Sequence, residues 1–264
     1  MKERMKEKKK YSSKKLFGCM FLGVLLGFLS SWVINSGLFE IQEGARTALS
    51  LLQTLALPLL LGVAACMAVV SETGLAAMKK IGEKLQEADE EECDELEYGL
   101  EKKGAFLLNF CTVSQALCFI LLSAGYSMEY IRSSGQARKA LLGACIIFIV
   151  SFIYNAFVQA RYVRLVQNLY PEKKGDVYSR KFQKEWLESC DEAERESIYR
   201  SSYQAYITLN RWIPILLAVS MVFHLYLNTG IMAVIMISLI WLLTTFSYTR
   251  SCVRLAGQKK GRAA

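Results

Sequence analysis

The chain has 264 residues, of which 53% are hydrophobic and 21% are charged, and its formal net charge is +8. This apolar composition excludes an intrinsically disordered chain, and only three Pro residues leave little material for a loop-rich fold. The charges are grouped between long uncharged runs, which is typical of a protein that crosses a bilayer and not of a soluble core.

Six apolar runs without Asp, Glu, Lys or Arg have about the length that a helix needs to cross a bilayer. Because hydrocarbon offers backbone amides no hydrogen-bond partner, such runs must be helical. The fifth is the shortest, with 16 residues, and the turn 228–230 separates it from the sixth. The sequence therefore predicts an all-α integral membrane helical bundle with six transmembrane helices, which are 16–34, 48–70, 105–125, 140–158, 212–227 and 231–248.

The basic residues predict the orientation of these spans. Lys and Arg beside a span resist translocation, and 28 of the 32 fall on one side if six spans are counted. We therefore expect both termini to be cytoplasmic and the loops on that side to be helical. The predicted order is a basic tail (1–15), a first membrane hairpin (16–70), an acidic helical loop (71–104), a second hairpin (105–158), a cytoplasmic helical segment (159–211), a third hairpin (212–248) and a tail (249–264).

The amino-terminal segment resembles a signal peptide, because a basic region precedes an apolar one. Its 19-residue apolar run is longer than a typical signal-peptide core, and no small-x-small cleavage site follows it. We therefore interpret it as a retained span. The basic tail has one aromatic residue, Tyr11, and lies beside that span. It therefore indicates anchoring at anionic lipid, and we expect no nucleic acid as a partner.

The loop 71–104 begins as an amphipathic helix and then becomes strongly acidic. Its apolar positions are spaced by three and four residues at Leu75, Met78, Ile81 and Leu85. Seven carboxylates follow between positions 89 and 97. They could hold a divalent cation, but without a Gly turn or spaced loop ligands a solvated helix face is the preferred interpretation.

The segment 159–211 extends the fourth span as a basic helix, which Pro171 and Gly175 interrupt. From Lys181 we expect a second helix with an apolar and aromatic stripe, supported by the i,i+4 ion pairs Asp191–Arg195 and Glu196–Arg200. This helix could lie on the membrane, pack within the protein or receive a partner. Its candidate partner-contact residues are Phe182, Trp186, Cys190, Asp191, Glu192, Tyr199 and Tyr203.

A short pattern occurs in both predicted cytoplasmic segments. Cys-Asp-Glu stands at positions 93–95 and again at positions 190–192, each time after a membrane hairpin. The repetition is consistent with a duplicated unit of hairpin plus helix, or with chance.

The stretch from Pro171 to Asp176, continued from Phe182 to Glu194 and at Ile198 and Tyr199, resembles an uncharacterised family of bacterial multi-pass membrane proteins, domain of unknown function 3169. The basic tail and the order of spans resemble that family too. The resemblance implies a bacterial plasma membrane, but it implies no activity, ligand or catalytic residue.

The eight cysteines indicate neither a disulfide framework nor zinc, because none lies in a predicted outer loop and none has metal-ligand spacing. Cys111, Gln115 and Cys118 share one face of the third span and are expected to pack between helices. His224 could relay protons, but no carboxylate accompanies it in any span. The candidate intramembrane polar residues are Asn109, Gln115, Asn155 and His224.

No catalytic constellation, metal set or cofactor motif is present, so we expect no enzyme and no cofactor. The preferred hypothesis is a non-enzymatic accessory, regulatory or protective membrane component that acts through its cytoplasmic helices. The alternative is a permease-like transporter subunit paired with a separate ATPase. An intramembrane enzyme that depends on His224 ranks last. The expected partners are the lipid bilayer and either another membrane or cytoplasmic protein or a second copy of the chain.

Overall fold

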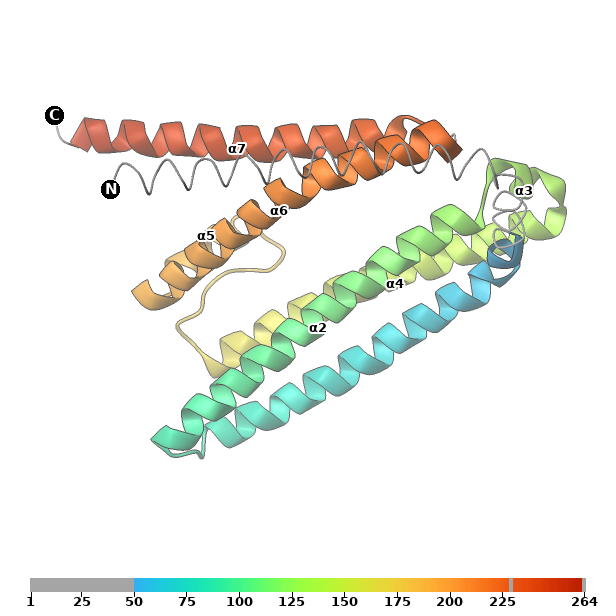
Figure 1. Ribbon diagram of the computed structural model, residues 1–264. Helices are drawn as coiled ribbons and strands as arrows, with labels where there is room; N and C mark the ends of the chain where they lie inside the picture. Colours follow the sequence, from blue (N-terminus) through green and yellow to red (C-terminus); the bar gives the residue numbers. More distant parts are fainter. Residues whose placement is uncertain (1–49, 228–229, 263–264) are drawn as a thin grey trace, which may run out of the picture. The chain divides into compact units, whose positions relative to one another are not determined.

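The computed structural model describes residues 50–227 and 230–262, and every regular element in them is an α-helix (Figure 1). The all-α prediction is therefore confirmed for this part of the chain. The chain divides into two compact units between Leu169 and Tyr170. The first unit contains the helices Ser50–Leu85, α2 (Glu90–Gly125), α3 (Met128–Ser133) and α4 (Gly135–Leu169); the second contains α5 (Phe182–Glu188), α6 (Glu192–Leu227) and α7 (Met232–Arg262).

Five of the described helices are long and apolar enough to cross a membrane. They contain the third, fourth and fifth predicted runs and nearly all of the second and sixth, one run in each helix. The first predicted span, 16–34, and the basic tail lie outside the described residues, so the count of six spans remains a prediction.

The helices continue well beyond the apolar runs. The segment 71–104 is helical, as predicted, except at a short turn, 86–89, where the extensions of Ser50–Leu85 and α2 are joined. The fifth span is likewise only the final part of α6, which begins 20 residues earlier at Glu192. An existing helix gains one hydrogen bond for each residue added, so it extends at low cost into water.

The prediction of one continuous helix from Lys181 is wrong. It is interrupted at residues 189–191, where α5 ends and α6 begins. The ion pair predicted between Asp191 and Arg195 does not form, because the Arg195 Nε donates to the Cys190 carbonyl oxygen at 2.8 Å. The predicted pair Glu196–Arg200 is confirmed at 2.6 Å.

The first unit is held together by a heptad-spaced seam of mainly small side chains. The buried positions of α4 include Ala137, Ala144, Ser151 and Val158, which are seven residues apart. In α2, buried residues follow one another at alternating intervals of four and three positions. They are Leu100, Gly104, Leu107, Cys111, Ser114 and Cys118. Spacing of this kind keeps one face of each helix toward its neighbour, and small side chains let helix backbones approach closely.

One layer of this seam joins all three long helices. Leu60, Cys118 and Ala144 form a buried cluster with one residue from each helix. On the same seam, the predicted stripe of the Ser50–Leu85 helix is confirmed at Leu75 and Met78, which are both buried. The packing of the first unit therefore extends from the predicted membrane region into the polar ends of the helices.

The second unit is a helical hairpin with little internal burial. The rings of Tyr206 and Tyr248 stack with their centroids 4.2 Å apart, and Trp241 Nε1 donates to Asn210 Oδ1 at 3.2 Å. In the most apolar window of α7 no residue is buried within the structure. Contiguous apolar exposure on this scale is typical of a surface that contacts lipid or another protein.

Gly125 permits the closest approach in the seam, and we expect Gly125→Ala to separate two helices. A Cβ atom at this position would lie 2.3 Å from the Ala56 Cβ. Overpacking of this kind costs about 1–3 kcal/mol, so the unfolding midpoint, followed by circular dichroism in detergent, should fall. Gly62→Ala is the matched control, because a Cβ there meets nothing within 4 Å. Equal midpoints for the two variants would contradict the close approach.

Candidate functional site

The segment between α4 and α6 folds back on the start of α6 through a buried lysine. The Lys173 ammonium donates to the carboxylate of Glu194 and to Cys190 Sγ, the latter at 3.7 Å. Only 8% of the Lys173 side chain is exposed, and Cys190 is 4% exposed. A buried ammonium requires such partners, because leaving its charge unpaired away from water is costly. The contact therefore fastens residues 170–181 to the start of α6.

A reciprocal capping box starts α6 at the same place. The Glu194 backbone N–H donates to Asp191 Oδ1 at 2.7 Å, and the Asp191 backbone N–H donates to Glu194 Oε2 at 3.1 Å. These two bonds satisfy amides that have no partner inside the helix. Glu194 thus serves the cap and the buried lysine together, so the direction of α6 is coupled to the segment before α5.

Further hydrogen bonds join the two halves of the stretch that carries the family resemblance. The Lys174 backbone N–H donates to Ser189 Oγ at 3.1 Å, and the Ser189 hydroxyl donates to the Trp186 carbonyl oxygen at 2.7 Å. The thiol of Cys190 donates to that same carbonyl oxygen at 3.3 Å. Residues 173–174 and 186–194 therefore form one local unit, which we call the capping unit.

Burial and charge act on the ionisable groups of the capping unit. Burial raises the pKa of the Cys190 thiol, although the positive charge of Lys173 acts the other way. Burial also opposes the charged form of Lys173, but its hydrogen bond to the Glu194 carboxylate and the attraction of that negative charge outweigh this and raise its pKa. The folded state thus favours a neutral thiol and a charged ammonium, which suits a structural role better than nucleophilic catalysis.

The predicted partner-contact residues divide into two groups. Phe182 and Trp186 are half-buried, with ring centroids 5.6 Å apart, and Cys190 is buried in the capping unit. Asp191 and Glu192 are exposed at the start of α6, and Asp191 also caps the helix. Tyr199 and Tyr203 are 58% and 53% exposed. The structure therefore leaves the α6 tyrosines as the accessible aromatic side chains of the set.

The predicted intramembrane polar residues do not form one site. Asn109 is exposed, whereas Asn155 is buried and accepts a hydrogen bond from Gln159 at 3.3 Å. Gln115 is 7% exposed, and both polar atoms of its side chain lack a hydrogen-bond partner among the described residues. His224, in α6, is half-buried, with an unpartnered Nδ1 within the same part of the chain.

An ion pair between the Ser50–Leu85 helix and α4 was missed by the sequence analysis. The Arg161 guanidinium forms a bidentate ion pair with the Glu72 carboxylate, with Nη1–Oε1 at 2.5 Å and Nη2–Oε2 at 3.0 Å. The Tyr154 hydroxyl donates to the same carboxylate at 2.9 Å. Both charged residues stand just beyond the apolar runs, but they are 89 positions apart, so no local pattern could have paired them.

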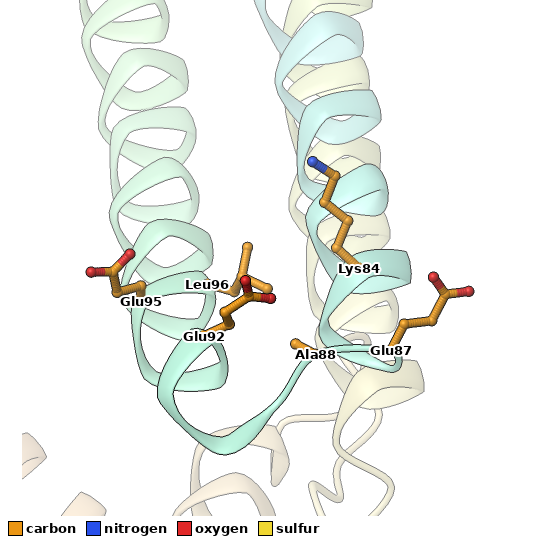
Figure 2. A pocket seen from close by; sticks show the side chains of 6 residues that line it. All are labelled: Lys84, Glu87, Ala88, Glu92, Glu95 and Leu96. Atoms are coloured by element: carbon orange, nitrogen blue, oxygen red, sulfur yellow. The ribbon is translucent and has the colours of Figure 1, made fainter.

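The acidic turn between the Ser50–Leu85 helix and α2 lines an open pocket of about 530 Å³ (Figure 2). Its lining residues include Lys84, Glu87, Glu92 and Glu95. Figure 2 shows Glu87 and Glu95 on opposite sides of the turn, with their carboxylates pointing apart. Residues 50–227 and 230–262, as far as their side chains are described, contain no group of three or more His, Cys, Asp or Glu residues that could hold a metal ion.

The repeated Cys-Asp-Glu pattern has two different local structures. Cys93 lies inside the first turns of α2, whereas Cys190 precedes the capping residue of α6. The three identical residues therefore do not correspond to a shared helix start.

We expect Asp191→Ala to loosen the start of α6. Loss of a capping side chain typically costs about 1 kcal/mol, so backbone amides at 192–195 should exchange with deuterium roughly fivefold faster. Mass spectrometry of the exchanged peptides measures the effect. Glu192→Ala removes an exposed carboxylate at the next position and serves as the control; equally fast exchange in this variant would contradict the capping role.

The buried thiol predicts a pH-dependent reactivity. Because folding raises the Cys190 pKa, the neutral thiol stabilises the capping unit below about pH 8.5, the pKa of an unfolded thiol, and this contribution is lost as pH rises through the folded value. At pH 8, iodoacetamide should modify Cys190 at least about tenfold more slowly than the half-exposed Cys93, and the difference should shrink at higher pH. Peptide mass spectrometry reads both sites; equal rates at pH 8 would contradict the burial.

Comparison with known proteins gives a family but no described relative. No curated protein and no solved structure matches the chain. A family model described as a protein of unknown function, DUF3169, matches residues 6–251, which include the capping unit and all five described candidate spans except the end of the last one. The chain therefore belongs to the DUF3169 family of proteins of unknown function.

Proposed function

We propose that the chain is a multi-pass protein of a bacterial plasma membrane, with both termini cytoplasmic, that acts by binding another protein. In this proposal it has no enzymatic activity of its own and serves as an accessory, regulatory or protective component. The binding surface is the aromatic face of α6 formed by Ile198, Tyr199 and Tyr203, which we call the tyrosine face.

The exposure of Tyr199 and Tyr203 outside the apolar run carries this proposal. They are one helical turn apart and precede Trp212, the first residue of the run, by 13 and nine residues. At 1.5 Å per residue they stand about 20 Å and 13 Å along the helix from the run. The headgroup layer adds only about 5–7 Å to the hydrocarbon on each side, so lipid does not cover a helix that continues straight.

The capping unit supports the same proposal because it holds this surface in a defined conformation. The start of α6 is capped by Asp191 and Glu194 and fastened through Lys173, only a few residues before the tyrosine face. Rigid Tyr side chains lose little conformational entropy on binding and are enriched among residues that dominate interface energies. A preorganised helix that presents two of them suits a protein partner.

Site-specific crosslinking in intact cells tests the proposal. With photoreactive benzoylphenylalanine in place of Tyr199, we expect one discrete protein adduct. The same replacement at Tyr178, a 62% exposed tyrosine outside the tyrosine face, should not give this adduct. Adding Tyr203→Ala should lower the Tyr199 adduct at least about fivefold, because truncating such a residue commonly costs more than 1 kcal/mol.

The alternatives correspond to other outcomes of this experiment. Adducts with lipid alone, or equal adducts at Tyr178, would refute the tyrosine face. An adduct with an ATP-hydrolysing protein would replace the accessory role with a permease-like transporter subunit, and an adduct only with a second copy would replace the partner with self-association.

A further inference from the structure

A groove with a basic lining lies between the polar ends of two helices of the first unit. It has a volume of about 330 Å³ and is formed by the Ser50–Leu85 helix and α4. Its charged lining consists of Lys79, Glu83, Arg161 and Arg164, which gives a positive balance, and amide side chains line it at Gln86 and Asn168. This volume lies in the lower range of small-molecule sites.

The positive charge of the groove is only partly neutralised within the protein. Arg161 is paired with Glu72, and Lys79 is 3.9 Å from Glu83 with both side chains largely exposed. A pair so exposed contributes little and exchanges readily with other partners. No ion pair joins Arg164 to a carboxylate within the described residues. An anion that displaces the Glu83 carboxylate from Lys79 would therefore meet one unpaired guanidinium and one available ammonium.

The position of the groove along α4 corresponds to the headgroup layer of a bilayer. The apolar run of this helix ends at position 158, so Arg161 and Arg164 follow it by three and six residues, or about 5 Å and 9 Å along the axis. The headgroup layer extends about 5–7 Å beyond the hydrocarbon, and the Arg side chains are long enough to reach lipid phosphates from there.

Most carboxylates of the acidic turn lie well above this level. Residues 89–92 lie at the tip of the hairpin, and position 92 precedes the third apolar run, which begins at 105, by 13 residues. Because these residues are helical from Glu90 on, the tip is about 20 Å from the run, and its charges are more than one Debye length, about 8 Å at physiological salt, from the headgroup layer. Glu97 is closer, at about 12 Å from the run.

We propose that this groove binds the headgroup of an anionic glycerophospholipid. Arg164 and Lys79 hold the phosphate, since a guanidinium matches two phosphate oxygens and an ammonium adds a point charge. The amide of Asn168 donates to oxygens of the headgroup alcohol on the water side of the phosphate. The inference rests on the proposed membrane insertion of these helices, but it is independent of the tyrosine face and of any protein partner.

Lipid titration of the purified full-length protein in detergent tests the site. Native mass spectrometry gives the dissociation constant of the first bound lipid for phosphatidylglycerol and for phosphatidylcholine. We expect wild type to prefer phosphatidylglycerol, and Lys79→Gln with Arg164→Gln to weaken its binding about fivefold for each charge removed. Binding of phosphatidylcholine should change little.

The matched control is Arg180→Gln with Lys181→Gln, which removes the same charge from two exposed residues outside the groove. This variant should bind phosphatidylglycerol as wild type does. Equal loss in both double variants, or no preference of wild type for phosphatidylglycerol, would overturn the proposal. Because all substituted residues are exposed, we expect unchanged circular dichroism, and the purified system leaves the crosslinking test of the tyrosine face unaffected.

Discussion

Backbone hydrogen bonding is the constraint on which the rest of this structure depends. A peptide group in hydrocarbon has no water to bind, so each apolar run has to satisfy its amides within its own helix. Once formed, such a helix propagates into water at low cost, and Ser50–Leu85, α2, α4 and α6 all continue beyond their apolar runs. Apart from residues 170–191, the polar parts that the structure describes are consequently mostly extensions of candidate membrane helices.

Helix packing then distinguishes the two units. Lipid is as apolar as a leucine side chain, so helices associate in a bilayer by close packing and hydrogen bonds and not by the hydrophobic effect. The first unit uses a heptad seam with small residues such as Ala56, Ala144 and Ser151. In the second unit, the specific contacts between α6 and α7 include the Tyr206–Tyr248 stack and the hydrogen bond from Trp241 to Asn210. Its apolar surface is therefore left almost entirely for lipid or for other protein.

The two proposed binding surfaces follow from the same helix extensions. Along α4, the first residues beyond the apolar run bring Arg161 and Arg164 to headgroup level, where an anionic lipid can be held. Along α6, the segment before the run places Tyr199 and Tyr203 above the lipid, where a protein can reach them. The two proposed surfaces therefore differ in their distance from the hydrocarbon: the nearer one suits a lipid phosphate, and the farther one suits a protein partner.

Parts of the candidate site could be read from residue patterns, and other parts could not. The Asp-x-x-Glu spacing at 191 and 194 is a known signature of a helix start. It predicts a new helix beginning after Asp191, and not the continuous helix that we expected from Lys181. The ion pair Glu196–Arg200 lies within one helix and was predicted correctly. Lys173 could not be assigned to Glu194 in this way, because an irregular segment and α5 separate them and only its folded path brings the two charges together.

The sequence by itself determined that the regular elements of the described residues are helices with runs apolar enough to cross a membrane, and it identified much of the inward-facing seam, including Leu75, Met78, Cys111 and Cys118. These properties depend on local composition and on the 3.6-residue period of a helix. Only the tertiary structure decided that Cys190 is buried beside Lys173 and that Glu72 meets Arg161. Those features are contacts between residues distant in sequence, and such contacts depend on the relative placement of helices, which no local pattern encodes.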